Sequence, residues 1–173
     1  MIVKRAADLA AYGAVRAATG AFISLDVRTA LHAARSAGRW YATSRLGRRR
    51  LVRAEQNLAQ AFPEWDPERV RRHAIASYEH LAMLGAEICY APRLLNEEGW
   101  TAHLGIGRIA TGLRELLKGR PVILITGHAG NWELLGYTAA LLGCPVHALY
   151  RPLDLRPLDE WVRRTRERRG LRL

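Results

Sequence analysis

The chain has 173 residues, of which 49% are hydrophobic. This length is enough for one domain with a hydrophobic core and too short for two ordinary domains. The two cysteines, Cys89 and Cys144, lie far apart in the sequence, without a CxxC pair or a Cys/His cluster. A disulfide-stabilised scaffold and a zinc module are therefore not supported.

The charge is strongly basic and unevenly spread. Against 16 Asp and Glu, the 27 Lys and Arg residues give a formal net charge of +11. Residues 1–60 carry eleven cations and three acids, and residues 151–173 carry eight cations and four acids, but residues 61–150 carry eight cations and nine acids. Basic ends on a near-neutral body indicate an anionic partner, such as phospholipid headgroups, phosphorylated substrates or nucleic acid.

The N-terminal segment is predicted to form an amphipathic helix. Charged residues interrupt its apolar run at Asp8, Arg16 and Asp26, so it is too short for a membrane-spanning helix and does not match a cleaved signal peptide. Apolar residues recur near helical spacing over 9–25, and many arginines follow up to Arg53. Such a helix can lie in the membrane interface; the alternative is a packed helix with a solvated arginine face. We expect residues 1–47 to form basic amphipathic membrane-associating helices, and residues 48–173 to form the next domain.

Further helices are predicted from apolar periodicity and end signals. One spans Arg48 to Phe62 and is closed by Pro63. The next has Asp66 as N-cap and Pro67 at its first position, and it runs toward Ile88. A shorter helix is predicted over residues 109–118, before a glycine.

The pattern changes at Pro121. Residues 122–125 form a short apolar run rich in β-branched residues, which predicts a strand buried in a parallel sheet. A helix over 132–142, a second strand over 145–150, a helix over 158–169 and the opening of a third strand at 171–173 follow. We therefore predict an α/β fold: an N-terminal helical region, then the first βαβ units of a mixed or parallel sheet. Because this sheet is incomplete, we expect a fragment or a truncated reading frame.

The candidate site lies directly after the first predicted strand, where functional groups of open α/β sheets collect. His128 and Glu133 are five residues apart, so on one helix they would point about 140° away from each other. They meet only if His128 lies in a loop and Glu133 in the first helical turn. Gly127 and Gly130 give the backbone that freedom, and Asn131 is a favoured N-cap residue.

A His–carboxylate pair suits acyl transfer. The carboxylate would fix the imidazole tautomer and stabilise the imidazolium as it takes a proton from an attacking hydroxyl. Free amides at the helix N-terminus could stabilise an oxyanion. The alternative is that His128 caps a turn and Glu133 simply favours the positive end of the helix dipole.

The string GHAGNWE at 127–133 resembles the motif of glycerolipid and lipid A acyltransferases, a His followed by four residues and an acidic residue. Its Gly-Asn-Trp-Glu part is similar to the bacterial lipid A branch, of lauroyl/myristoyl type, of the lysophospholipid acyltransferase superfamily. Two further segments agree in order: NLAQAFPEW at 57–65 with the helix after it, and Tyr150-Arg151-Pro152 with Leu158-Asp159 and a basic helix. The resemblance covers roughly residues 50–173.

The resemblance implies an acyltransferase that moves a fatty acyl chain from acyl carrier protein or acyl-CoA to a hydroxyl of a lipid A precursor or related glycolipid. Residues 48–173 would be the N-terminal part of the acyltransferase domain. The enzyme would work at the cytoplasmic face of the cell inner membrane, peripheral or weakly anchored, on an anionic glycolipid or phospholipid acceptor. No cofactor and no metal are implied.

By the same resemblance, His128 is the general base and Glu133 its partner. Substrate-binding positions are implied at Arg151, Gly130, Asn131 and Trp132. Arg151 also ends a predicted strand, and its guanidinium suits phosphate; the alternative is a solvated loop arginine. The chain departs from the family in having Arg156-Pro157 where Asn-Pro is usual, and in lacking the family's later motifs.

Two other functions stay open. One is an acyltransferase of the same superfamily acting on phosphatidylinositol mannosides or another phospholipid. The other is a non-catalytic basic module that binds anionic membrane or nucleic acid, which charge alone supports. No helix-turn-helix glycine turn, RNP motif or basic zipper is found, so we expect no nucleic-acid partner.

Overall fold

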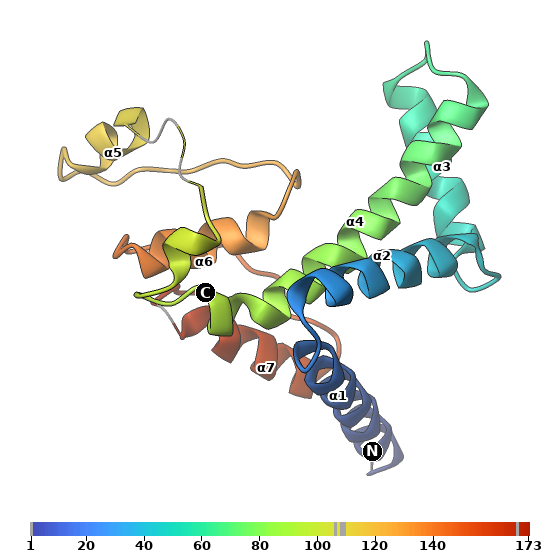
Figure 1. Ribbon diagram of the computed structural model, residues 1–173, viewed down its shortest axis with the longest axis horizontal. Helices are drawn as coiled ribbons and strands as arrows, with labels where there is room; N and C mark the ends of the chain where they lie inside the picture. Colours follow the sequence, from blue (N-terminus) through green and yellow to red (C-terminus); the bar gives the residue numbers. More distant parts are fainter. Residues whose placement is uncertain (1, 106, 108–109, 169) are drawn as a thin grey trace. The chain divides into compact units, whose positions relative to one another are not determined.

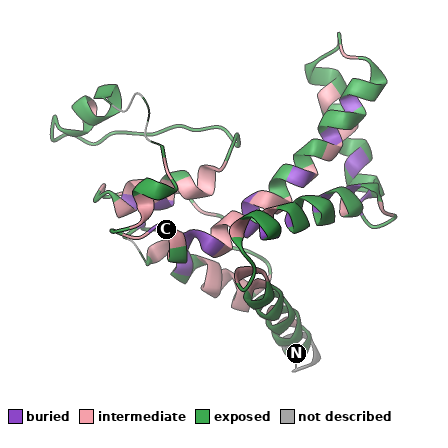
Figure 2. Ribbon diagram, in the orientation of Figure 1, coloured by how far each residue is buried: buried purple, intermediate pink, exposed green. Residues whose placement is uncertain are grey.

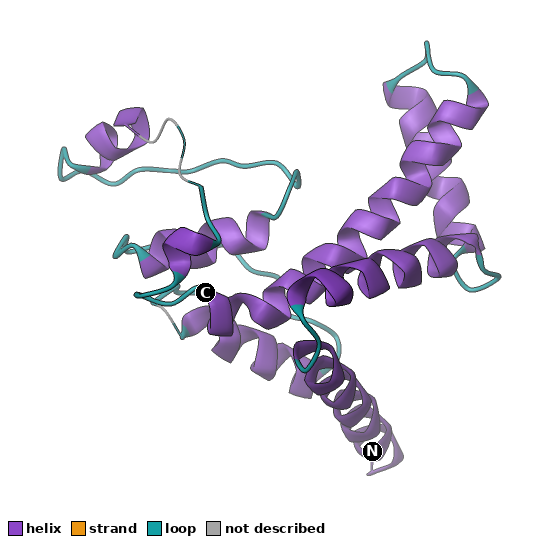
Figure 3. Ribbon diagram, viewed as in Figure 1, coloured by secondary structure: helices purple, strands orange, loops and turns teal. Residues whose placement is uncertain are grey.

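The computed structural model describes residues 2–105, 107, 110–168 and 170–173. It divides into two compact units, Met1–Tyr90 and Ala91–Leu173. Both are built from helices, and the described residues contain no strand (Figures 1 and 3).

The first unit contains four helices in chain order: α1 (Ile2–Ile23), α2 (Val27–Thr43), α3 (Arg48–Ala61) and α4 (Pro67–Leu94), the last turn of which lies in the second unit. Two predicted helices, 48–62 and the one starting at Pro67, are confirmed as α3 and α4. Asp66 caps α4 as expected, because its Oδ1 accepts a hydrogen bond of 2.7 Å from the Arg69 N–H. Unlike the prediction, α4 continues through Pro92 to Leu94.

Helices α2 and α4 pack closely because α2 presents a stripe of small residues. Its buried positions follow a spacing of four and are Ala30, Ala34, Gly38 and Ala42. At Gly38 a Cβ would lie 2.5 Å from the Tyr78 carbonyl oxygen, so only glycine fits this approach. One hydrophobic cluster joins α2, α3 and α4 through the buried residues Ala42, Leu51 and Ala74. Figure 2 colours the buried residues of the chain purple.

A buried carboxylate also fixes α2 against α4. Glu79 on α4 is only 4% exposed, and it accepts hydrogen bonds of 2.8 Å from Arg35 Nε and 2.6 Å from Arg39 Nε. Burial works against ionisation of Glu79, but the two arginines outweigh it and lower its pKa below the ordinary 4.5. The Glu79 carboxylate is therefore ionised and hydrogen-bonded to both arginines, as a buried carboxylate requires.

The N-terminal amphipathic segment is a helix, α1, as predicted. Its end is tied to α4 because the single O–H of the buried Tyr90 lies within hydrogen-bond distance of two carbonyl oxygens, those of Phe22 and Leu25, and is shared between them. Leu9 is 54% exposed on α1. Among the described residues, no helix has the length and apolar character needed to cross a membrane.

The second unit contains the short 3₁₀ helix η1 (Trp100–Ala102), then α5 (Ala110–Leu116), α6 (Trp132–Leu141) and α7 (Arg156–Glu167). The three predicted helices in this part are confirmed as α5, α6 and α7, although their expected ends at Ile109 and Arg169 lie outside the described residues. Gly119 follows α5 with a φ of +68°, a conformation that favours glycine at a helix end. The core of this unit is formed by Ala91, Leu95 and Tyr137.

The predicted α/β fold is wrong. Residues 122–125, the first expected strand, lie in a loop without a strand partner among the described residues, and Ile123 and Ile125 are 88% and 93% exposed. A strand needs a neighbour to satisfy its backbone groups, and no described residue supplies one here. The second and third expected strands meet in a single parallel bridge, His147 with Arg172, and the βαβ units are not formed.

Candidate functional site

The start of α6 has the local geometry that the sequence requires. Asn131 is the N-cap, and its side-chain oxygen accepts a hydrogen bond of 3.0 Å from the Leu134 N–H. Gly130 adopts a φ of +62°, a left-handed conformation that side chains disfavour. Glycine and asparagine at these positions therefore let the chain turn from the loop into the helix, with Glu133 in the first helical turn.

His128 lies in the exposed loop before α6, as the motif requires. Its ring packs edge-on against Trp132, with ring centroids 4.8 Å apart and an interplanar angle of 64°. Trp132, the first residue of α6, is half-buried. The tryptophan thus supports the imidazole of His128, which is otherwise an exposed residue.

Glu133 is held by an arginine from a different helix. Arg166 on α7 donates two hydrogen bonds to the carboxylate, 2.8 Å from Nε to Oε2 and 2.5 Å from Nη2 to Oε1. Both side chains are half-buried, at 21% exposure for Glu133 and 22% for Arg166. This two-point geometry fixes the plane of the carboxylate as well as its position.

The structure does not bring His128 and Glu133 into hydrogen-bond contact: the described residues contain no such bond. Arg166 does not occupy all the hydrogen-bond acceptor sites of the Glu133 carboxylate, however. Two carboxylate oxygens offer about four lone-pair sites, and Arg166 uses one on each oxygen. Glu133 keeps the capacity to accept a further N–H from an imidazole.

A second network fixes the segment that contains Arg151. The hydroxyl of Tyr150 donates to the Asp159 carboxylate on α7, which also accepts a hydrogen bond of 2.7 Å from the Leu153 N–H. These bonds, the one from Tyr150 first, lower the pKa of Asp159 below 3.8. Burial, and then the bond to Asp159, raise the pKa of Tyr150 above 10.0. The Arg166 guanidinium lies 5.1 Å from the Tyr150 ring centre, so one side chain touches both networks.

Arg151 itself is exposed, and the described residues give it no ion pair. It projects from a segment that the Tyr150 and Leu153 contacts hold in place on either side. The remaining candidate positions, Gly130, Asn131 and Trp132, form the turn into α6 described above. No group of three or more His, Cys, Asp or Glu side chains that could hold a metal ion occurs in the described ranges.

Arg166 was not predicted as a site residue from the sequence, where it belongs only to a basic helix. Spacing carried a usable signal: Arg166 follows Leu158 and Val162 at steps of four, so it continues the half-buried face of α7. An arginine on such a face needs an acidic partner. The sequence could not show which acid supplies it.

Comparison with known proteins identifies a family to which the chain is similar. The model of the family described as bacterial lipid A biosynthesis acyltransferase matches residues 13–173. The match includes the loop with His128, the start of α6 and the whole of α7. Searches among curated proteins and among solved structures gave no match.

Proposed function

Because the chain belongs to the bacterial lipid A biosynthesis acyltransferase family and is an acyltransferase of that general type, we propose that it transfers a fatty acyl chain from acyl carrier protein or acyl-CoA to a hydroxyl of a lipid A precursor or related glycolipid. The family match over the His128–Glu133 segment carries this proposal. The basic composition fits an anionic acceptor at the cytoplasmic face of the inner membrane.

In the proposed reaction, the acceptor hydroxyl oxygen attacks the carbonyl carbon of the thioester. His128 takes the hydroxyl proton as the new C–O bond forms. The C–S bond then breaks, and the imidazolium returns the proton to the departing thiolate, which leaves as a thiol. The products are the acylated acceptor and the free thiol of the donor.

Glu133 is proposed to orient the imidazole and to stabilise its charged form. Arg166 is the positioning residue behind it, since its two hydrogen bonds hold the carboxylate plane at the start of α6. A change in the His128 loop, with glycine on both sides of the turn, would let the imidazole reach the free lone pairs of Glu133. Arg151 is proposed to bind a phosphate of the acceptor or donor.

Turnover by the purified full chain tests this proposal. The assay mixes an acyl carrier protein thioester with three separate acceptors, a lipid A precursor, a phosphatidylinositol mannoside and a phospholipid, and detects the new ester by mass spectrometry. We expect transfer to the lipid A precursor, and a loss of at least about 10²-fold in His128→Ala. His103→Ala is the matched control, because His103 is exposed in the same unit and has no assigned role; it should keep the wild-type rate.

Three results would count against the proposal. Full turnover in His128→Ala would show that His128 is not the general base. Preference for another acceptor would reject the lipid A precursor as the substrate. Absence of transfer to all three acceptors by the folded wild-type chain would reject the activity.

Arg166→Lys should lower kcat more than it raises KM, since lysine keeps the charge but loses the two hydrogen bonds that orient the Glu133 carboxylate.

A further inference from the structure

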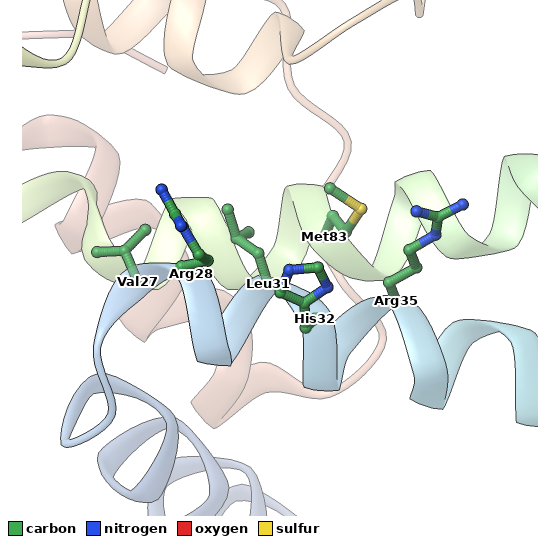
Figure 4. Close-up of a pocket in the computed structure, with 6 residues that line it drawn as sticks. All are labelled: Val27, Arg28, Leu31, His32, Arg35 and Met83. Carbon is green, nitrogen blue, oxygen red and sulfur yellow. The ribbon is translucent and has the colours of Figure 1, made fainter.

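A groove in the first unit runs between α2 and α4. It has a volume of about 390 Å³. Five of its lining residues come from α2 and one from α4: Val27, Arg28, Leu31, His32, Arg35 and Met83. Figure 4 shows Val27 and Arg28 toward one end of the row of α2 side chains and Arg35 toward the other, with Leu31 and His32 between them. The volume is at the lower end of that of small-ligand sites.

The groove combines cationic edges with an apolar floor. Arg28, His32 and Arg35 follow each other at steps of four and three, so they lie on one face of α2. Leu31 and Met83 are half-buried and supply apolar surface beside that face. A ligand that satisfies both parts must carry an anionic group and a hydrocarbon portion within the same molecule.

The cationic edge is not neutralised within the first unit. Helix α2 contains three arginines and no acid. Glu79 compensates one charge, because it pairs with both Arg35 and Arg39. The nearby Asp26 already serves as the α2 N-cap through the Thr29 N–H. The described residues supply no ion pair to Arg28 or His32, both of which are exposed.

Arg35 is held in place for this role. Its Nε is bound to the buried Glu79 carboxylate, yet its side chain remains 60% exposed. The guanidinium therefore keeps donors directed away from Glu79 while one end is anchored, which reduces the entropy lost on binding an anion.

We propose that this groove binds one anionic phospholipid from a membrane surface. Arg28 and Arg35 contact the phosphate from two sides with His32 between them, and the first acyl methylenes lie against Leu31 and Met83. Inorganic phosphate would leave the apolar floor unused. Single-stranded nucleic acid is bound by stacking successive bases on several aromatic rings, whereas the lining residues include no Phe, Tyr or Trp and a single imidazole, that of His32. The proposal requires no acyl transfer, so it stands apart from the proposed reaction.

Native mass spectrometry of the full chain in non-ionic detergent tests the site. Three probes are added separately: dioctanoyl phosphatidylglycerol, dioctanoyl phosphatidylcholine and soluble glycerophosphate. We expect saturable binding of one phosphatidylglycerol, weaker binding of phosphatidylcholine and the weakest binding of glycerophosphate. Equal binding of glycerophosphate and phosphatidylglycerol would show a phosphate site instead of a lipid site and would overturn the proposal.

Variants locate the binding. Arg28→Gln should weaken phosphatidylglycerol binding about fivefold or more, the effect of removing roughly one lipid-facing cation. Arg53→Gln on α3 is the charge-matched control, since Arg53 is exposed and outside the groove; it should leave binding unchanged. Leu31→Gln should weaken lipid binding and leave glycerophosphate binding as it was. His128→Ala should bind lipid normally, which separates this site from the reaction centre.

Equal losses in Arg28→Gln and Arg53→Gln would show diffuse charge attraction and would overturn the assigned site. So would binding of several lipids with no saturable first step. Far-UV circular dichroism checks that each variant is folded; His32→Gln replaces Arg28→Gln if that variant loses helix content, with the same expected direction.

Discussion

A methyl group added at Gly38 tests the close packing of α2 on α4. An added Cβ would lie 2.5 Å from the Tyr78 carbonyl oxygen and 3.0 Å from both the Glu79 Cα and the Ala82 Cβ. Two of these three atoms belong to the backbone, so they cannot turn aside as the end of a flexible side chain would. The cost of overpacking is then near the upper end of its range, about 3 kcal/mol.

The same substitution has an opposing benefit. Alanine favours a helix interior over glycine by about 1 kcal/mol, so Gly38→Ala should lower the free energy of unfolding by about 2 kcal/mol. Gly85→Ala on α4 is the matched control, because no atom lies within 4 Å of its added Cβ. That variant should be stabilised by roughly 0.5–1 kcal/mol.

Urea unfolding followed by far-UV circular dichroism measures both variants. The expected separation between them is about 3 kcal/mol, well above the uncertainty of a linear extrapolation. If Gly38→Ala were as stable as Gly85→Ala, the two helices would not approach as described and the reasoning would be refuted.

Three further predictions concern single interactions. Glu79→Gln should lower the free energy of unfolding by about 1.5–3 kcal/mol at neutral pH. Glu68→Gln should have little effect, because the Glu68 side chain is 81% exposed in its ion pair with Arg72. Because the folded-state pKa of Glu79 lies below 4.5, its contribution is present above that pH and is lost as the pH falls through the folded-state value; a difference between wild type and Glu79→Gln that stays constant down to strongly acidic pH would contradict this. Asn131→Ala should destabilise α6 by about 1 kcal/mol, and Asn131→Asp much less, as seen in hydrogen exchange of the helix amides. Tyr150→Phe should raise the pKa of Asp159 toward 3.8 in a carboxyl NMR titration, and an unchanged titration would mean that the hydroxyl is not its donor.

The helices could be predicted from the sequence because their signals are local. Asp66 and Pro67 mark the start of α4, and Asn131 marks the start of α6, through bonds that form within one turn. The continuation of α4 through Pro92 was not predicted. Proline removes one backbone donor near a helix end, but packing of Ala91 and Leu95 in the second core can hold the last turn together.

The strands could not be predicted in the same way, because strand formation depends on a partner that is distant in the sequence. An apolar run such as 122–125 states a preference for extended backbone, but a strand exists only where a second segment pairs with it. In the described structure the run remains exposed, whereas residues 145–150 and 171–173 meet at a single bridge. The apolar, β-branched composition of 122–125 therefore did not produce a strand in the described structure.

In the candidate site too, contacts between neighbouring residues could be predicted from the sequence and contacts between distant residues could not. The turn at Gly130 and the placement of Glu133 in the first turn of α6 followed from residues within one short segment. The partner of Glu133 is 33 residues away on α7, and only the folded chain selects Arg166 from a helix that contains several arginines. In the structure, Glu133 is the acidic partner of a salt bridge with Arg166. A hydrogen bond from the His128 imidazole to Glu133, as proposed, must therefore use carboxylate lone pairs that Arg166 leaves free. Arg166→Ala therefore separates two roles, since it should release Glu133 to move and lower turnover even though the histidine and the carboxylate are both still present.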